Sequence, residues 1–512
     1  MKKLIVENYR KMRNRLTDSA GRPSWIVSLI PFAVLACAMI VVIRIFGADS
    51  LLGGSQVALL FSSGVVVAIS MIFYKIPWNT FEDSICDNIR SVGNAVLILL
   101  LIGAIAGSWM ISGIVPTLIY YGMKIITPCI FLFACCIISA LISIMTGSSW
   151  TTIATVGVAM TGIGTALGYE PGWTAGAIIS GAYFGDKISP LSDTTVLASS
   201  SSGTPLFTHI RYMMVTTVPS FVIAVITFLA VSLTHGSSDA ARTEEFADSL
   251  LGTFNISPWL LVVPLLTGVL IARKVPAILT LFLAAVMAGI TALIAQPDVI
   301  REVALGAENA VKGGALSFHD GVKGLMTAYY GRTDILTGNP ALDELIATRG
   351  MTGMLNTVFL IICAVTFGGV LTGSGMMQSL TAMMARCVHR TVSAVAATVG
   401  TGVFCNMVTG DQYLSIIMTS SLYRKLFSDR GLESRLLSRS VEDSATVTSV
   451  LIPWNSCGMT QATVLKVATL DYLPYCIFNL VSPLMSVFVA ATGYRIRYRN
   501  RLQAEQNVAG TK

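Results

Sequence analysis

Long apolar runs recur along the whole chain and are separated by short polar segments. Clear examples occupy residues 25–46, 56–74, 92–110, 212–233 and 472–491, and about ten such runs follow in series. Each approaches the ~20 residues that an α-helix needs to cross a bilayer. One run alone could be a buried helix of a soluble protein, but ten in series could not. The pattern therefore predicts an all-α polytopic membrane protein.

Two of these stretches have two apolar legs joined by a polar tip, and each is predicted to be a re-entrant hairpin. The first covers 128–168, with its tip at 146–149, and the second covers 392–422, with its tip at 409–411. Together with about ten full transmembrane helices, the hairpins complete the predicted fold. Each half of the chain has two spans, a hairpin, a span with acidic residues and a closing span.

The charges between the spans predict the topology, because Lys and Arg are enriched in cytoplasmic loops. The N-terminal 24 residues carry seven basic residues, and the apolar run that follows is too long for a cleaved signal peptide. Segment 235–255 holds four carboxylates against one arginine and is predicted to lie outside, whereas the basic segment 424–439 is predicted to lie inside. Both termini are then cytoplasmic, in the plasma (inner) membrane of a bacterium.

With this topology the first set of elements begins outside and the second begins inside, so the halves are predicted to be inverted repeats. The predicted organisation is a basic cytoplasmic N-terminus (1–24), a first transmembrane span with its loop (25–55), a first repeat (56–234), an acidic external loop with a connecting span (235–274), a second repeat (275–491) that contains an external insertion of unknown fold (296–353), and a basic cytoplasmic tail (492–512).

Composition excludes several classes of function. The chain is 54% hydrophobic and 12% charged, and its net charge of +7 lies largely in the loops, so lipid and not nucleic acid is its expected partner. Ten cysteines and four histidines are too dispersed for a metal centre or a zinc site. We find no phosphate-binding loop for ATP and no nucleophile motif, so we expect a secondary transporter without a cofactor, and not an enzyme.

The most informative segment is 185–195, Gly-Asp-Lys-Ile-Ser-Pro-Leu-Ser-Asp-Thr-Thr, which places three charged residues inside an otherwise apolar stretch. A charge at the bilayer centre costs roughly 2.5–3.5 kcal/mol on insertion scales, so these charges need a reason. Pro190 disfavours helix at Ser189 and predicts a break that frees backbone carbonyls. Clustered oxygen ligands suit a hard cation such as Na⁺. The alternative is a solvated loop between two short spans.

A matching segment, 440–456, carries Glu442 and Asp443 at the start of an apolar span and a Pro-Trp-Asn sequence further along. We expect Asp443 to be the inward-facing carboxylate; the alternative is that both acids stabilise a helix N-terminus. The two hairpin tips, with their hydroxyl, carboxylate and amide groups, can likewise contribute to a binding site or act as ordinary helix caps.

These motifs resemble the NhaC family of sodium/proton antiporters, within the ion-transporter superfamily. The resemblance rests on 185–195 and is supported by Ser-Trp-Met-Ile-Ser-Gly-Ile-Val-Pro at 108–116, Gly-Ser-Ser-Trp-Thr at 147–151 and Ile-Pro-Trp-Asn at 452–455. It implies an inverted-repeat membrane fold and coupling to Na⁺ and H⁺. It does not fix the substrate, because relatives include exchangers of malate and lactate.

We therefore expect a Na⁺/H⁺ antiporter with alternating access, in which Na⁺ and H⁺ are the transported ions. Asp186, Asp193, Ser189 and Thr194 are the expected Na⁺ ligands, with Lys187 as a counter-ion of the carboxylates. The other candidate ion- or substrate-binding residues are Ser148, Ser149, Asp411, Asp443 and Asn455.

Two alternatives stay open at this point. One is a Na⁺- or H⁺-coupled carrier or exchanger of a small organic acid or an amino acid, in which Lys187 and the hairpin N-termini bind the solute. The other is a channel or a membrane scaffold. The sequence leaves open the Na⁺/H⁺ stoichiometry, the selectivity against Li⁺ or K⁺, and whether the protein is a homo-oligomer.

Overall fold

The computed structural model describes residues 23–46, 53–234, 240–273, 275–306, 316–386, 388 and 390–496. Within these ranges the chain is helical, apart from turns, irregular segments and isolated bridges such as the one between Thr333 and Thr348. Eight described helices are long and apolar enough to cross a membrane, or up to ten spans result if each of two bent helix pairs counts as one. The chain is therefore an all-helical, multi-pass membrane protein, as its hydropathy pattern predicts.

The helices of the first half are α2 (Trp25–Phe46), α3 (Gly54–Tyr74), α4 (Trp78–Ile111), α5 (Ile114–Ile125), α6 (Phe131–Thr146), α7 (Ser149–Thr152), α8 (Val158–Ala166), α9 (Pro171–Ile188), α10 (Asp193–Ser202) and α11 (Leu206–Thr234). A π-helical turn, Ile153–Gly157, joins α7 to α8, so these three elements form one leg of the first hairpin.

The connecting region contains α12 (Ala240–Thr253), α13 (Val262–Ala272), α14 (Ala277–Ala295), α15 (Pro297–Leu305), α16 (Phe318–Tyr330) and α17 (Pro340–Ile346). The second half contains α18 (Leu355–Gly373), α19 (Met376–Arg386), α20 (Thr391–Thr409), α21 (Gln412–Asp429), α22 (Ser434–Val441), a π-helical turn (Glu442–Thr446), α23 (Ser456–Leu465), α24 (Thr469–Tyr472) and α25 (Ile477–Thr492).

The predicted spans 174–199 and 441–460 are both interrupted helices. The first is α9 followed by α10, with the break at 189–192, where Pro190 removes a backbone donor. The second consists of the π-helical turn, a short 3₁₀ turn and α23, with the break at 452–455, where Pro453 lies. Predicted span 257–272 consists of a 3₁₀ turn, Pro258–Leu261, and α13, and its segment 258–270 meets the end of α12 at a bend of 88°.

Helices α6 and α9 approach each other closely because two glycines of α9 face α6. A Cβ atom on Gly181 would lie 2.1 Å from the carbonyl oxygen of Cys136, and one on Gly185 would lie 2.3 Å from that of Ala140. The spacing of these two glycines thus serves helix packing, as expected of small residues in membrane helices. This contact fixes the first hairpin against the helix that carries Asp186.

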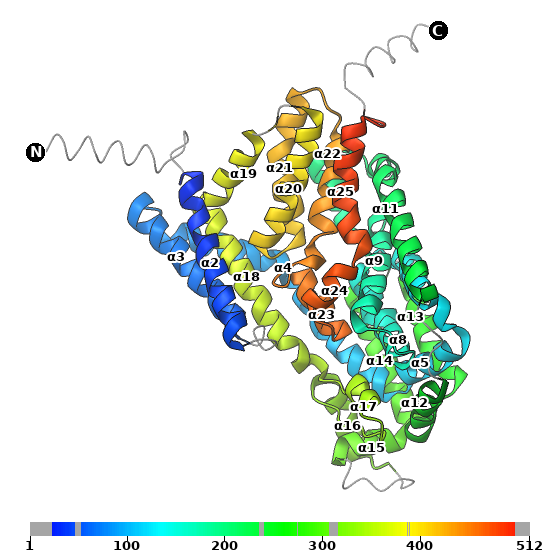
Figure 1. Cartoon of the computed structure of the whole chain (residues 1–512). Helices are drawn as coiled ribbons and strands as arrows, with labels where there is room; N and C mark the ends of the chain where they lie inside the picture. The colour runs from blue at the N-terminus through cyan, green and yellow to red at the C-terminus, as the bar shows by residue number, and fades with distance from the viewer. Residues whose placement is uncertain are drawn as a thin grey trace, which may run out of the picture.

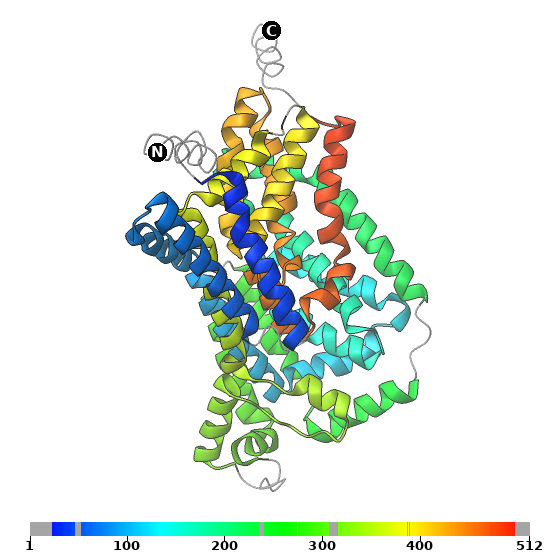
Figure 2. The same cartoon turned by 60° about the vertical axis from the view of Figure 1, so that its left-hand side comes forward.

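The short helices of the connecting region gather at one end of the molecule, whereas α21, α22 and the C-terminal end of α25 reach the opposite end (Figure 1). The same separation holds after a 60° turn (Figure 2). In its described part, the predicted insertion 296–353 is thus a group of short helices at one end of the molecule, beside α12. The basic segments 1–22 and 497–512, and residues 235–239, 274, 307–315, 387 and 389, lie outside the described residues.

A single cysteine introduced into α12 and one introduced into the α21–α22 turn are expected to react from opposite sides of the membrane. The physical reason is the opposite position of these elements in the molecule and the opposite charge of their sequences. The measurement is labelling of intact cells by a membrane-impermeant maleimide, with labelling of permeabilised cells as the control. Equal labelling of both positions in intact cells would contradict the predicted inverted topology.

Candidate functional site

The tip of the first hairpin is a turn built by Thr146, Gly147 and Ser148. Gly147 has a φ of 65°, which is the left-handed conformation that glycine adopts without strain. The backbone N–H of Ser148 donates to Thr146 Oγ1 at 3.2 Å, and the same oxygen lies 3.2 Å from Thr152 Oγ1. The N–H of Thr151 donates to Ser148 Oγ at 3.2 Å. Ser148 is therefore the N-terminal cap of the second leg.

The tip of the second hairpin has the same construction from different residues. Gly410 has a φ of 64°, and the N–H of Asp411 donates to Thr409 Oγ1 at 3.3 Å. That oxygen lies 3.1 Å from Ser415 Oγ, and the N–H of Leu414 donates to Asp411 Oδ1 at 2.9 Å. Asp411 is thus a helix cap, which was the alternative to an ion ligand.

The two interrupted helices also correspond to each other. In the first, Ser192 caps α10 by accepting the N–H of Thr195 at 3.3 Å. In the second, Asn455 caps α23 by accepting the N–H of Cys457 at 3.0 Å. Each break therefore ends in a capped helix that starts inside the protein, and Asn455 acts as a cap in this structure.

Each hairpin contacts the interrupted helix of its own half through the residue that follows the cap. Ser149 Oγ donates to Asp186 Oδ2 at 2.8 Å. In the second half, Ser449 Oγ donates to Gln412 Oε1 at 3.4 Å. In both halves the contact joins the residue after the hairpin cap to a residue just before the break. In the first half that residue is a carboxylate, Asp186, and in the second half it is Ser449.

Asp186 is the best candidate for an ion ligand. Its residue is 4% exposed, and its Oδ1 atom has no hydrogen-bond partner among the described residues. A buried carboxylate oxygen without a donor is unfavourable, so this atom is available to a cation or a proton. It lines a cavity of about 710 Å³.

The cavity lies between the first hairpin tip, the break of the first interrupted helix, the start of α21, and parts of α4 and α14. Its lining residues are Asn94, Ile98, Thr146, Gly147, Ser148, Trp150, Thr151, Asp186, Leu191, Asp193, Val275, Pro276, Ala277, Ile278, Thr280, Gln412, Tyr413 and Ile417. Two of these side chains are carboxylates and none is Lys, Arg or His. The charge of the lining therefore favours a cation over an anion.

Asp193, the second carboxylate of the cavity, is held by donors from the protein. Its Oδ2 accepts the hydroxyl of Tyr413 at 2.8 Å, and its Oδ1 accepts the N–H of Thr194 at 3.0 Å. The Tyr413 contact joins the first interrupted helix to the second hairpin. Sequence reasoning missed Tyr413, because a tyrosine after a helix cap carries no distinctive pattern.

The hydroxyls of Ser189 and Thr194 are engaged by other protein groups, and neither residue is among those that line the cavity. Ser189 Oγ donates to the carbonyl of Ile144 at 2.9 Å, and Thr194 Oγ1 lies 2.9 Å from Ser192 Oγ. Of the four residues predicted to ligate Na⁺, the structure thus brings two, Asp186 and Asp193, to the cavity wall.

Lys187 differs from its predicted role, because the ion pair that the structure gives it is with Asp443. Both side chains are fully buried. The ammonium also donates to Ser482 Oγ at 3.0 Å, and Asp443 accepts the hydroxyl of Thr216 at 2.9 Å. The physical reason is geometric: successive residues of a helix point in different directions, so Lys187 faces away from Asp186.

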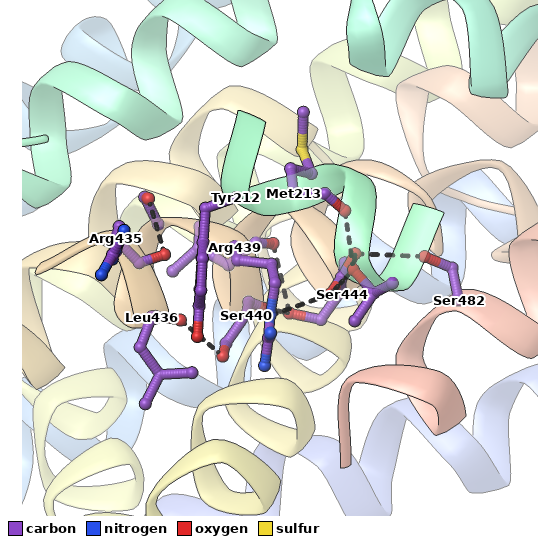
Figure 3. Close-up of polar contacts among 12 residues, drawn as sticks. Tyr212, Met213, Arg435, Leu436, Arg439, Ser440, Ser444 and Ser482 are labelled. Carbon is purple, nitrogen blue, oxygen red and sulfur yellow. Dashed lines mark hydrogen bonds and ion pairs between the residues drawn. The ribbon is translucent and has the colours of Figure 1, made fainter. Parts of the chain in front are cut away.

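Asp443 therefore joins the second interrupted helix to the first and lies away from the cavity wall. Thr216 on α11 and Ser482 on α25 were not predicted, because hydroxyls in apolar helices are common and usually bond to their own backbone. Arg439, one helical turn before Asp443, is also fully buried, with its Nε 3.9 Å from Asp443 Oδ2. Figure 3 shows its side chain beside the ring of Tyr212, over which the guanidinium lies at 4.9 Å.

Comparison with known proteins gives one family. The sequence model of the Na⁺/H⁺ antiporter family matches residues 19–201 and 181–494. The antiporter NhaC of Bacillus subtilis is 34% identical over 437 residues, which cover 84% of this chain and 91% of that protein.

Other relatives are named for different substrates. The malate-2H⁺/Na⁺-lactate antiporter of Bacillus subtilis is 34% identical, over 87% of this chain and 92% of its own length. The arginine/ornithine antiporter ArcD of Halobacterium salinarum is 30% identical, over 96% and 97%. Among solved structures, Neisseria gonorrhoeae MtrF matches 94% of this chain and 97% of its own chain, at 13% identity and a TM-score of 0.31, which is too low to support an argument.

Replacing Asp443 alone is expected to destabilise the protein more than replacing Asp443 and Lys187 together. Asp443→Asn leaves the buried Lys187 ammonium without its counter-charge, at a cost of about 3–5 kcal/mol, whereas Lys187→Met leaves Asp443 beside Arg439. The double variant removes the uncompensated ammonium and is expected to regain part of the stability that Asp443→Asn loses. The measurement is thermal unfolding of the purified protein in detergent.

Lys124→Met, which removes an exposed lysine, is the control and is expected to unfold like the wild type. Strictly additive effects of the two substitutions in a double-mutant cycle would show that the pair does not act as an interacting unit.

Proposed function

The chain belongs to the Na⁺/H⁺ antiporter family, a family of secondary transporters and not of enzymes, and we propose that it exchanges cytoplasmic Na⁺ for external H⁺. The observation that carries this proposal is the unpartnered oxygen of Asp186 in a cavity whose charged lining residues are both carboxylates. Such a cavity attracts a cation. Na⁺ and H⁺ then exclude each other at Asp186, because a protonated carboxyl is a poor ligand for a cation.

The residues around Asp186 suit this role. Carboxylate, hydroxyl and carbonyl oxygens are the ligands of hard cations. In our proposal Asp186 is the principal ligand, Asp193 contributes through its cavity-facing carboxylate, and Ser148 and Ser149 position the hairpin tip. Ser189, Thr194, Asp411 and Asn455 hold the backbone of the tips and breaks in place through the hydrogen bonds given above.

We propose further that the halves are inverted repeats that alternate access to this site. The support is the correspondence of the two glycine-containing tips, the two capped breaks, and the contacts of Ser149 with Asp186 and of Gln412 with Ser449. Elements of this kind, in matching positions of two halves, surround the binding site of secondary transporters. Rocking of one packed unit against another would expose the cavity to each side in turn.

The proposed location is the plasma membrane of a bacterium, with both termini in the cytoplasm. It rests on the positive charge of the terminal segments and on the bacterial origin of the two Bacillus subtilis relatives.

The large acidic cavity supports a second candidate, the exchange of a small organic cation. A volume of about 710 Å³ is far larger than a dehydrated Na⁺ requires. The relative ArcD is named for arginine and ornithine, which carry positive charge, whereas the malate and lactate of another relative are anions. Lys187 is engaged by Asp443 and is not free to bind a carboxylate, which disfavours an organic acid.

Proteoliposomes that contain the purified protein distinguish these substrates. We expect an imposed Na⁺ gradient to drive proton movement without any organic solute. Arginine uptake that needs internal ornithine or arginine would instead support the second candidate. Malate-dependent Na⁺ or H⁺ movement would contradict the argument from the charge of the cavity.

The exchange itself is expected to depend on pH with a defined sign. In the acidic range, where protons occupy the shared carboxyl, the Na⁺ concentration for half-maximal exchange should rise about tenfold per pH unit for each competing proton, and it should level off at alkaline pH. Asp186→Asn removes the titrating group and is expected to abolish coupled exchange. The measurement is Na⁺-driven proton efflux in proteoliposomes with equal pH on both sides.

Asp429→Asn, which changes an exposed carboxylate at the end of α21, is the matched control and should exchange like the wild type. Robust exchange by the Asp186→Asn variant, or a half-maximal Na⁺ concentration that does not vary with pH, would contradict the shared carboxyl.

A further inference from the structure

Glu442 is a buried acidic residue that the proposed exchange does not yet use. It is fully buried, and neither carboxyl oxygen has a hydrogen-bond partner among the described residues. It begins the π-helical turn Glu442–Thr446, and such turns occur frequently at functional sites. Thr446, which ends this turn, also has a buried hydroxyl without a partner.

The charged groups nearest to Glu442 come from three elements. Lys187, Asp186 and Asp443 are within electrostatic reach of its carboxyl. The ammonium of Lys187 is committed to Asp443 and Ser482, so it does not neutralise Glu442 directly. Arg439, on α22, is three residues earlier in the chain, and its guanidinium lies 3.9 Å from Asp443 Oδ2 and 4.9 Å from the ring centre of Tyr212.

The other elements around the π-helical turn add few titratable groups. Helix α25 contains none, and α20 contributes Cys405. Helix α21 contributes the buried Tyr423, whose hydroxyl lies 2.9 Å from Thr401 Oγ1 on α20. Asp193 and Tyr413, at the first turns of α10 and α21, are bonded to each other. His209 on α11 lies 2.8 Å from Ser438 Oγ through its Nδ1.

Positive charge added at Asp186 favours ionisation of Glu442. Among the charged groups that flank Glu442, Lys187 and Arg439 are positive, and Asp186 and Asp443 are negative when ionised. Where Asp186 carries no proton of its own, Na⁺ binding there adds one positive charge, and ionisation of Glu442 offsets it. Added charge in a low-dielectric interior is costly, so the two events are then favourable together.

We propose that Glu442 is a proton-binding residue of the exchange: it holds a proton while the cavity is free of Na⁺ and releases that proton when Na⁺ binds at Asp186. This rests on the proposed function and adds to it a carboxyl group deeper than the cavity wall. The O–H bond of Glu442 breaks, the proton passes to solvent, and the electron pair stays on the carboxylate. Binding of H⁺ from the other side of the membrane reverses the step.

The arrangement separates the two tasks that coupling requires. Asp186 lines the cavity and can contact the ion, whereas Glu442 is not among the lining residues. The protonation of Glu442 then depends on the charge at Asp186, although Glu442 does not contact Na⁺. When two carboxyl groups interact, as Asp186 and Glu442 do in this proposal, their protons are released by the pair and not by either group alone. Removing one carboxyl therefore removes its part of the released protons.

Proton release on Na⁺ binding tests this assignment without requiring transport. The purified full-length protein, in lipid nanodiscs and weak buffer, is mixed with NaCl, and the released protons are measured with a pH indicator across a pH series. Na⁺ bound is measured in parallel, and choline chloride is the control for ionic strength. The number of protons released per Na⁺ bound is expected to fall by up to one in Glu442→Gln, with the loss largest where the wild type releases most.

Glu442→Asp keeps a carboxyl group and is expected to retain proton release, which separates proton binding from a structural effect of the longer side chain. Unchanged release in Glu442→Gln would overturn the proposal. Weaker Na⁺ affinity in Glu442→Gln is expected, because the negative charge that offsets Na⁺ is absent, so proton release is compared at saturating Na⁺. Absence of Na⁺ binding in the wild type would instead contradict the proposed function. That result is seen with the wild type alone, so it can be distinguished from a failure of the Glu442 proposal.

Discussion

A charged side chain in the membrane interior needs an opposite charge within the protein. In this chain Lys187 of the first half and Asp443 of the second half provide that charge for each other. Both residues are fully buried, and Thr216 and Ser482 complete the hydrogen bonding of the pair. Because a lone charge there would be costly, the pair ties the end of α9 to the π-helical turn of the second half. Movement of either interrupted helix must therefore carry the other with it or separate the pair.

The backbone of the hairpin tips obeys a related constraint, since unpaired N–H and C=O groups are unfavourable away from water. In each tip a threonine hydroxyl, that of Thr146 or Thr409, accepts the backbone N–H of the residue two positions later. The left-handed glycine between threonine and cap lets the chain reverse without strain. The tip so formed brings Ser149 to Asp186, so the carboxylate that we propose as the Na⁺ ligand depends on that turn for its hydrogen bond.

Periodicity and charge could predict much of this arrangement. Pro190 and Pro453 mark both breaks, and the Thr-Gly-Ser and Thr-Gly-Asp sequences mark both tips. Asp186 and Asp193 are recognisable because carboxylates are rare in apolar stretches. The partner of Lys187 was not predictable, because it comes from a residue 256 positions away and depends on helix orientation. Thr216, Ser482 and Tyr413 carry no signal in sequence, since their residue types are ordinary in membrane helices.

The roles of Asp411 and Asn455 illustrate the limit of reasoning from residue type. An oxygen-bearing side chain after a glycine suits both an ion ligand and a helix cap, and the hydrogen bonds show caps at both positions. The halves are therefore alike in backbone and unlike in charge. Position by position, the contact that joins Ser149 to Asp186 joins Gln412 to Ser449, where no carboxylate is present. One half thus supplies the cavity carboxylates, and the other supplies Glu442 and Asp443. In the proposed exchange, a cation that enters the cavity meets negative charge from the first half, and Glu442 of the second half responds to that charge. On this proposal, coupling between the ions follows from two halves that have similar backbone elements and different charged residues.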